Sequence, residues 1–434
     1  MADSSPLSSN NSQSKDRQIW RDLVKGLLLI ALLVVIKVVL EHTAFGKAME
    51  RSGYDWLQTQ LSSSERLPLV VVDLSDLEPQ EFNIDGQIGI ATPRNTLREL
   101  IKAATEQKAR AIGVDIDFSP GPSGYMWPRD PEFFDFCLKN EVPVFLGISR
   151  GESLSPDKWL GNEDYKDLAA SMIIPNDTRK MPMWIRIGTD SEPGKTLGAA
   201  LATGYQESQS GLAKWLHDFH LVEQVSEKEL GHDVGVGEFP VDYSSLKTLI
   251  DKTLRTRNPV VIRDQGHLLR NKIVIFGPGT LSNSGDGFKI EGFEQRVPGV
   301  YIHASAAYTL RNAPLYELTR LSRLGIDVLL SLIVLFSVIA IQSRFSHGST
   351  KLAKHRVHFV FTILIIIVAL IFGIAFVVQT RVLWSDFILV VALLMLHVPI
   401  EHLFKKGHSG IKSAYERTKQ LISAVFTEKE RKTK

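Results

Sequence analysis

The sequence of 434 residues has a single cysteine and none of the short motifs that mark common catalytic sites. Cys137 cannot form an intramolecular disulfide, so the fold must be held together by its hydrophobic core. We interpret Cys137 as a small buried residue, with an intermolecular bridge as the alternative. The patterns HExxH, GxSxG and GxxxxGK[ST] are absent, and Gly277-Pro278-Gly279 does not complete a dinucleotide fingerprint. We therefore expect no enzymatic activity and no cofactor.

An excess of charge of either sign is also missing. The chain has 50 Lys and Arg against 48 Asp and Glu, which leaves a net charge of +2. This balance gives no indication of a nucleic-acid partner. Residues 1–18 are poor in apolar side chains and rich in Ser and Asn, which predicts a disordered cytoplasmic N-terminus.

Long apolar segments are what the sequence does contain. We predict four transmembrane helices, because about 20 apolar residues cross a bilayer core: 19–40, 324–342, 357–378 and 382–400. The third is the clearest, since 357–378 has no Asp, Glu, Lys or Arg. The first follows a basic stretch and also fits a signal peptide, so its cleavage stays open.

The distribution of Lys and Arg predicts the orientation of these segments. Basic residues flank the first segment, fill the loop after the second and follow the fourth, whereas residues 379–381 read only QTR. With four spans, all the basic flanks lie on one side, which places both termini in the cytoplasm and residues 41–323 outside. The expected location is a bacterial inner membrane, with the large domain on the periplasmic or extracellular side.

Three charged residues fall inside or beside the apolar segments. Lys37, Asp327 and Asp386 are each within a few residues of a predicted end, so an interfacial position explains them. The alternative is pairing between helices, for example Lys37 with Asp386.

The region between the first and second apolar segments has an α/β pattern. Apolar runs at 68–74, 109–118, 143–148 and 272–277 predict strands. Thr92-Pro93 predicts a helix with Thr92 as N-cap and Pro93 at its first position, and 300–310 predicts another helix. The expected fold class is an α/β extracytoplasmic domain, mainly a parallel sheet with helices on both faces, plus four transmembrane helices.

Several of these segments resemble the CHASE2 domain, an extracytoplasmic sensory domain of bacterial transmembrane receptors. The resemblance rests on VVVDL, TPRNTLRELIKAATEQKARAIGVDIDFS, NKIVIFGPGTLSNSGDGF and VPGVYIHASAAYTLRNAPL, in this order. It covers about residues 20–400 and implies a sensory domain at 41–323. Family members commonly continue into a kinase or cyclase, whereas only the basic tail 401–434 follows here. We therefore expect a signal to leave through a separate protein partner.

Candidate ligand-binding residues lie where predicted strands end. Carboxylates at the carboxyl ends of parallel strands meet at one edge, where open α/β sheets bind ligands. An arginine at a helix start could clamp an anion with the first N–H groups. Each has a structural alternative as a turn cap, an internal salt bridge or a core histidine, and no metal motif is complete. The candidates are Asp73, Arg94, Asp115, Asp117, Asp286 and His303.

Two functions fit these observations. The first is a membrane-anchored sensor or input subunit that detects an extracytoplasmic ligand or protein. The second is a non-catalytic docking subunit of a bacterial envelope complex. The expected partners are the lipid bilayer, an output protein and an unknown small ligand, while homo- or hetero-oligomerisation is open. The basic tail could form an amphipathic helix that lies on lipid or binds a partner, or remain a solvated end that fixes topology.

Overall fold

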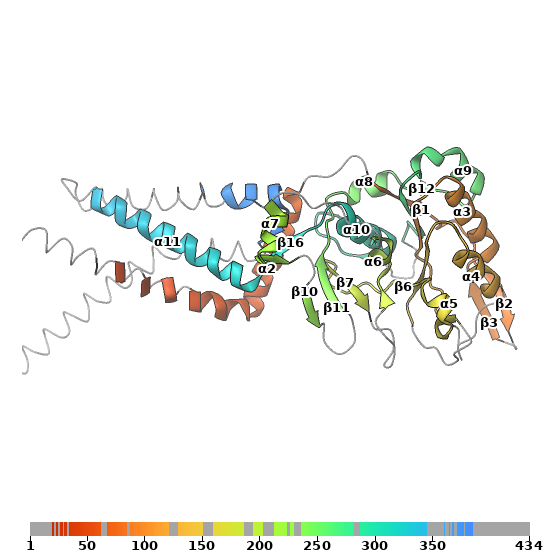
Figure 1. Ribbon diagram of the computed structural model, residues 1–434, viewed down its shortest axis with the longest axis horizontal. Coiled ribbons are helices and arrows are strands. Elements are labelled where there is room, and N and C mark those ends of the chain that lie inside the picture. Colours follow the sequence, from red (N-terminus) through yellow and green to blue (C-terminus); the bar gives the residue numbers. More distant parts are fainter. Residues whose placement is uncertain are drawn as a thin grey trace, which may run out of the picture. The chain divides into compact units, whose positions relative to one another are not determined.

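The computed structural model describes most of the chain between residues 34 and 344 (Figure 1). The described residues are 34–61, 67–84, 87–120, 129–150, 159–185, 194–202, 212–223, 226–229, 236–281, 287–344 and 378–384, with scattered positions between 20 and 32 and between 360 and 376. The chain divides into two compact units. One comprises Asp55–Thr319 with Phe376–Trp384, and the other comprises Met1–Tyr54, Arg320–Ala375 and Ser385–Lys434.

A six-stranded parallel sheet forms the centre of the first unit. Its four longest strands lie within the predicted apolar runs, which confirms those predictions; three have nearly the predicted bounds, whereas the run 109–118 forms only the short strand 111–114. The order is β12 (Leu254–Arg255), β1 (Leu69–Asp73), β13 (Ile273–Gly277), β4 (Ala111–Val114), β5 (Val144–Ile148) and β6 (Ala169–Ser171).

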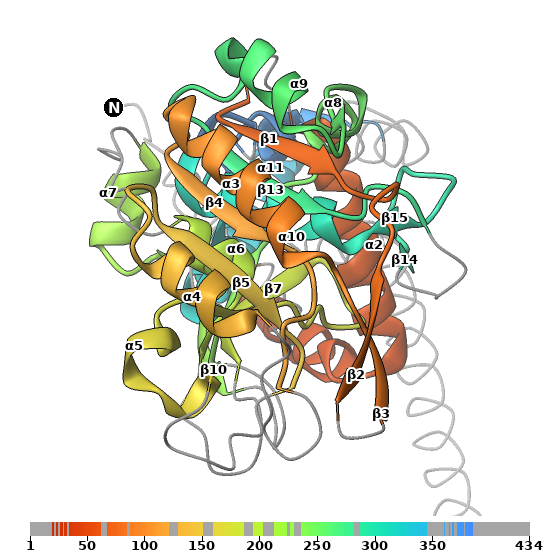
Figure 2. The ribbon, with the colours of Figure 1, turned by 90° about the vertical axis from the view of Figure 1, so that its right-hand side faces the viewer.

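Helices cover both faces of this sheet, as expected for strands that are buried throughout. Alternate residues of β1 point to opposite sides: Val70 and Val72 join one apolar cluster, Leu69 and Val71 the other. Figure 2 shows α3 and α4 in front of β4 and β5. The first face carries α3 (Arg94–Glu106), α4 (Asp130–Leu138) and α9 (Pro259–Asp264), and the second carries α6 (Leu197–Ala202), α8 (Leu246–Asp251) and α10 (Gly299–Asn312).

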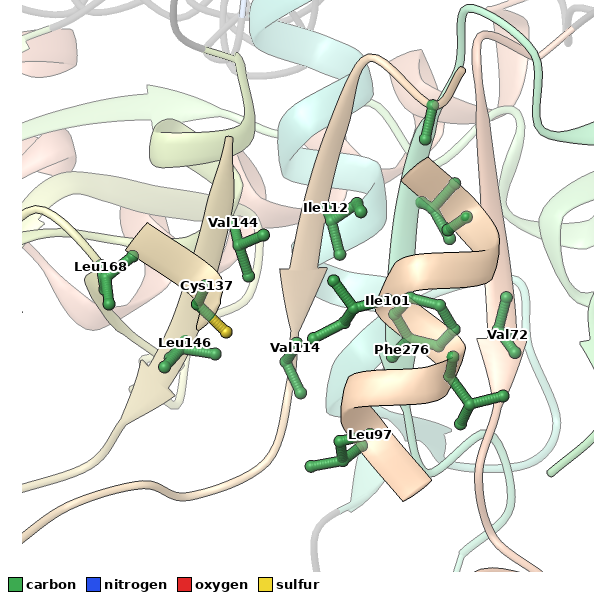
Figure 3. Close-up of a cluster of buried hydrophobic side chains, with 14 of the residues drawn as sticks. Val72, Leu97, Ile101, Ile112, Val114, Cys137, Val144, Leu146, Leu168 and Phe276 are labelled. Atoms are coloured by element: carbon green, nitrogen blue, oxygen red, sulfur yellow. The ribbon is translucent and has the colours of Figure 1, made fainter. Parts of the chain in front are cut away.

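Helix α3 shows the link between sequence period and packing. Leu97, Leu100 and Ile101 recur on one helical face and are fully buried against the sheet (Figure 3). The predicted start of this helix is off by one residue. Pro93 is the N-cap, with an extended backbone and no side-chain cap, so that Arg94 is the first helical residue.

Cys137 lies on α4 and points into the same core, toward Leu146 of β5 (Figure 3). The side chain is 2% exposed, and burial raises the pKa of its thiol. Because the thiolate is the reactive form of cysteine, this residue is chemically inert in the folded domain. The prediction of a small buried residue is confirmed.

Smaller elements surround the central sheet. The antiparallel sheet β10-β11-β7-β8 consists of β10 (Ser226–Glu229), β11 (Val236–Pro240), β7 (Lys180–Ile185) and β8 (Gly194–Lys195). The sheet β17-β16-β9 consists of β17 (Val382–Leu383), β16 (Tyr316–Leu318) and β9 (Val222–Glu223). The remaining elements are α2 (Ala44–Gln60), α5 (Glu163–Lys166), α7 (Leu212–Asp218), α11 (Arg320–Arg344), the 3₁₀ helices η2 (Trp159–Gly161) and η3 (Gly266–Leu268), and the hairpins β2 (Gln80–Ile84) with β3 (Gln87–Ala91) and β14 (Gly287–Phe288) with β15 (Val297–Pro298).

The prediction of four transmembrane helices is wrong for the part of the chain that the structure describes. No helix there combines the length and the apolar character that crossing a membrane requires. The predicted span 324–342 falls in α11, which has charged residues at 320, 323 and 327, and the predicted span 382–400 opens as strand β17. The predicted N-terminus 1–18, the tail 401–434 and most of 357–378 lie outside the described residues.

The charged residues of the apolar segments form a different ion pair from the expected one. Lys37 forms an ion pair with Asp327, and both side chains are about 5% exposed. Lys37 also lies 3.2 Å from Glu41, one turn along its own helix. Pairing between apolar segments therefore occurs, but with Asp327 as the acid, while Asp386 lies outside the described residues.

Candidate functional site

Three of the predicted site residues, Asp73, Asp115 and Asp117, lie at the carboxyl edge of the parallel sheet. β13 lies between β1 and β4, so its following loop passes between Asp73 and Asp115. A Cβ atom at Gly277 would lie 2.9 Å from the Asp115 Cβ, and one at Gly279 would lie 2.7 Å from the Asp73 Cγ. Glycine is needed at both positions because the loop backbone contacts these two acids directly.

Asp73 holds this loop in place. Its Oδ1 accepts hydrogen bonds from the Gly279 N–H at 2.7 Å, the Ser75 N–H at 2.9 Å and the Ser75 hydroxyl at 2.5 Å. The side chain is buried, and Arg255 lies 3.9 Å from its other oxygen. Asp73 therefore acts as a cap that joins the ends of β1 and β13.

Asp115 and His303 meet inside the domain. The Nε2 of His303 lies 3.7 Å from Asp115 Oδ1 and 3.2 Å from the carbonyl oxygen of Met172. Because a carbonyl oxygen only accepts, the contact with Met172 places a proton on Nε2. Both side chains are less than 5% exposed, and Nδ1 of His303 has no hydrogen-bond partner among the described residues. The pair is positioned below the surface, at the start of α10.

Asp117 organises the neighbouring turn. Its oxygens accept hydrogen bonds from the hydroxyl and N–H groups of Ser119 and Ser149, including one at 2.7 Å from the Ser149 hydroxyl. Partial burial of the carboxyl raises its pKa, but these donors outweigh burial and hold the pKa of Asp117 below its ordinary value. The carboxylate therefore joins the segment after β4 to the end of β5.

Arg94 does not face the other candidates. Its Nε donates to Asp130 at 2.6 Å, and both side chains are at most 3% exposed. The guanidinium lies over the Phe118 ring, 4.3 Å from its centre, and also donates to the carbonyl oxygen of Thr92. The geometry is that of the internal salt bridge weighed as the alternative to an anion clamp.

The remaining candidate, Asp286, lies outside the described residues. No group of three potential metal ligands occurs in the described ranges. A surface pocket of about 630 Å³ lies away from the sheet edge, between α3 and α4. Its lining includes both basic and acidic side chains, for example Arg98, Lys102 and Glu132.

The chain matches the CHASE2 domain over residues 28–341. It belongs to the CHASE2 family. CHASE2 is an extracellular sensory domain, which supports a sensory role for this protein. No curated protein and no solved structure matches the chain.

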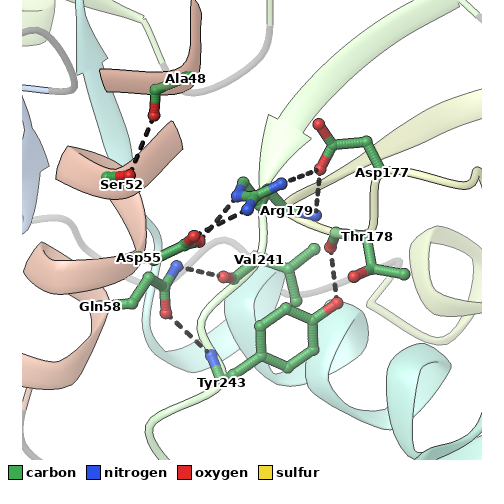
Figure 4. Close-up of polar contacts among 9 residues, drawn as sticks. All are labelled: Ala48, Ser52, Asp55, Gln58, Asp177, Thr178, Arg179, Val241 and Tyr243. Atoms are coloured by element: carbon green, nitrogen blue, oxygen red, sulfur yellow. Dashed lines mark hydrogen bonds and ion pairs between the residues drawn. The ribbon is translucent and has the colours of Figure 1, made fainter. Parts of the chain in front are cut away.

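A second constellation in the CHASE2 domain was not predicted from the sequence. Pro240 ends β11, because proline cannot donate to a sheet ladder, and residues 241–243 then cross to α8. We call residues 241–243 the junction segment. The Val241 carbonyl accepts from the Gln58 side chain at 2.6 Å, and the Tyr243 N–H donates back to Gln58 at 3.2 Å (Figure 4). The junction segment is thus bound to the last turn of α2.

The same end of α2 is bound by Arg179, which lies in the turn just before β7. Arg179 donates from Nε and NH2 to the two oxygens of Asp55, both at 2.7 Å, and from NH1 to Asp177 at 3.0 Å (Figure 4). Tyr243 completes the arrangement by donating to the Thr178 carbonyl at 2.6 Å. The bidentate ion pair between Arg179 and Asp55 fixes the orientation of the two side chains as well as their distance.

The centre of the junction segment binds the short stretch Phe376–Trp384. Asp242 is fully buried and accepts a hydrogen bond from NH2 of Arg381. The same guanidinium donates to the carbonyl oxygens of Ala313 at 2.9 Å and Pro314 at 3.3 Å, beyond α10. Arg381 has a left-handed backbone with φ of +57°, which is unfavourable for a non-glycine residue. These contacts hold that conformation.

Proposed function

We propose that this CHASE2 protein is a sensor or input subunit. Its α/β domain detects an extracytoplasmic ligand or protein, and a separate partner protein carries the output. The proposal includes attachment to a bacterial membrane but no particular set of spanning helices, and it includes no catalytic activity of the chain itself. Membership of the CHASE2 family supports the sensory role.

The observation that carries the proposal is the junction segment. One stretch of three residues binds Gln58 near the end of α2 and Arg381 of the Phe376–Trp384 stretch. These two partners belong to the parts of the chain that adjoin the apolar sequences. The Asp242 N–H also donates to the Thr309 hydroxyl at 2.8 Å, within α10. A shift of α10 relative to the sheet would therefore act on Asp242 and Arg381 together.

The same helix contains His303, whose Nε2 lies close to Asp115 at the sheet edge. α10 thus extends from the Asp115–His303 pair at one end to Thr309 and the Ala313 carbonyl at the other. Packed helices move as rigid elements between discrete arrangements. We therefore infer that α10 couples the Asp115–His303 pair to the contact between Asp242 and Arg381.

The test uses the full-length protein in its native membrane. Cross-linking followed by mass spectrometry identifies the partner, and the partner's activity is then compared between wild type and Arg381→Gln. We expect the variant to keep its partner. The activity of the partner should, however, equal the activity in a strain from which this protein is deleted. Arg263→Gln, which removes an exposed pair with Glu106, is the matched control and should behave as wild type.

The second candidate is a docking subunit of an envelope complex. It is favoured by one observation, namely that Arg94 is used internally by Asp130 and does not face a ligand. In that case the partner would carry no output activity, and Arg381→Gln would weaken co-purification itself. A partner whose activity is unaffected by Arg381→Gln would contradict the sensor proposal.

A further inference from the structure

Two aromatic side chains at the end of α7 are exposed side by side, one on the helix and one in the turn that follows it. Trp215 is 52% exposed and Phe219 is 61% exposed, and their ring centres are 4.8 Å apart. They are four residues apart and therefore lie on the same face of the helical turn. Exposed neighbouring aromatic rings on a folded domain indicate a contact surface. We call Trp215 and Phe219 the aromatic pair.

The aromatic pair is fixed beside the strand that leads out of the domain. β9 follows α7 and pairs antiparallel with β16. The Thr319 N–H donates to the Leu221 carbonyl at 3.1 Å, and the ring of His217 lies 6.0 Å from that of Tyr316. Thr319 is the last residue before α11. The end of α7 is therefore tied by hydrogen bonds to the point where the chain enters α11.

α11 exposes apolar residues along one side. Leu329, Ile333 and Phe336 are each about half exposed, and their spacing places them on one helical face. Asp327, in contrast, is buried against Lys37. An exposed apolar stripe on a helix needs an apolar environment. The chain that continues from Thr319 therefore has an apolar face suited to a membrane surface or an apolar partner.

We propose that the aromatic pair rests in the interfacial layer of a lipid membrane. The Trp side chain favours that layer, where its apolar ring and its polar N–H are both accommodated, and a neighbouring Phe adds apolar surface. The exposed His217 and His220 lie on the same turn and give the patch a polar rim. A protein partner fits less well, because a stable interface takes about 800 Å² from each side and two rings supply only part of that.

A site-specific label tests the proposal on the full-length protein. Phe219→Cys is labelled with a nitrobenzoxadiazole fluorophore and placed in nanodiscs of phosphatidylcholine and phosphatidylglycerol containing doxyl-labelled lipid. The native thiol, Cys137, stays unlabelled because it is buried and its pKa is raised. Ile90→Cys is the matched control, since Ile90 on β3 is 64% exposed and apolar. Asp218→Cys provides a second position on the same turn if Phe219→Cys does not fold.

We expect the doxyl lipid to quench the label at 219 and to leave the label at 90 unchanged. Quenching at neither position would overturn the proposal. Equal quenching at both positions would overturn it as well, because contact would then not be specific to the aromatic pair. Shielding of the label at 219 that depends on protein concentration and not on lipid would assign the surface to a second copy of the chain instead.

Discussion

Two arginine–aspartate pairs, Arg94–Asp130 and Arg381–Asp242, connect different parts of the CHASE2 protein. In the first pair neither side chain is more than 3% exposed, and Arg94 also lies over Phe118. In the second pair Asp242 is fully buried, but Arg381 is 26% exposed. The first pair links the starts of α3 and α4 on one face of the sheet, whereas the second links the junction segment to the stretch Phe376–Trp384.

The difference between the pairs lies in what they join. Arg94 and Asp130 belong to elements that also share the apolar core, so their separation disrupts the α/β layer itself. Arg381 belongs to a short stretch that is held by backbone contacts to β16, by its own guanidinium and by the buried side chains of Val382, Leu383 and Trp384, which belong to neither apolar cluster of the sheet. Loss of the second pair can therefore release one segment while the core stays packed, which is what a signalling contact requires.

The largest effect is expected from Asp130→Asn, which keeps the shape of the side chain and removes its charge. Arg94 would then be a buried cation without its acid, so the free energy of unfolding should fall by about 3–5 kcal/mol. Urea unfolding of the full-length protein, followed by circular dichroism, measures this change. Glu106→Gln removes the acid from the exposed pair with Arg263 and should leave the unfolding midpoint unchanged. Equal midpoints for the two variants would show that burial gives Arg94–Asp130 no special role.

The core of the domain could be predicted from sequence because its signals are local. The runs LVVVD and IVIFG are continuously apolar, and Leu97, Leu100 and Ile101 follow the helical period. Strands β6 and β12 have only three and two residues, too few for a periodic pattern, and were missed. The four spans were predicted from apolar length alone, and that prediction is wrong for the described helices.

The candidate site was less predictable because its contacts are long-range. Asp73 and Asp115 lie at the ends of β1 and β4, as their sequence positions indicate, but which donors the carboxylates bind depends on loop geometry. Asp130 is 36 residues from Arg94, and Arg381 is 139 residues from Asp242. Residues 379–381 looked like a bare connection, and only the folded structure shows that Arg381 is inserted between Asp242 and the Ala313 carbonyl.

A smaller and more local effect is expected from Arg381→Gln. The change removes a charge-assisted hydrogen bond to Asp242, which typically contributes about 1.5–3 kcal/mol. Hydrogen exchange with mass spectrometry should show faster exchange in residues 376–384 and at Tyr316, whose N–H donates to the Arg381 carbonyl at 3.0 Å. Peptides from β4 and β13 should exchange as in the wild type. Faster exchange throughout the central sheet would remove the distinction between the two pairs.

The smallest effect is expected in the pH dependence of stability, and it contrasts the exposed residue Asp117 with the buried Asp130. Because the folded-state pKa of Asp117 is lowered, its contribution to stability is present above the ordinary Asp pKa of about 3.9 and is lost as the pH falls through the folded value. Ser149→Ala removes one hydroxyl donor to Asp117, so the pKa of Asp117 should move back toward the ordinary value and this contribution should be lost at a higher pH.

Thermal unfolding between about pH 3 and pH 6 measures the shift, with Asp117→Asn as the variant in which the contribution is absent. Asp117 is exposed at the surface, so added salt should reduce the difference, unlike the loss caused by Asp130→Asn. A Ser149→Ala profile that coincides with the wild type at low salt would show that the serine hydroxyl does not hold the carboxylate in its charged form.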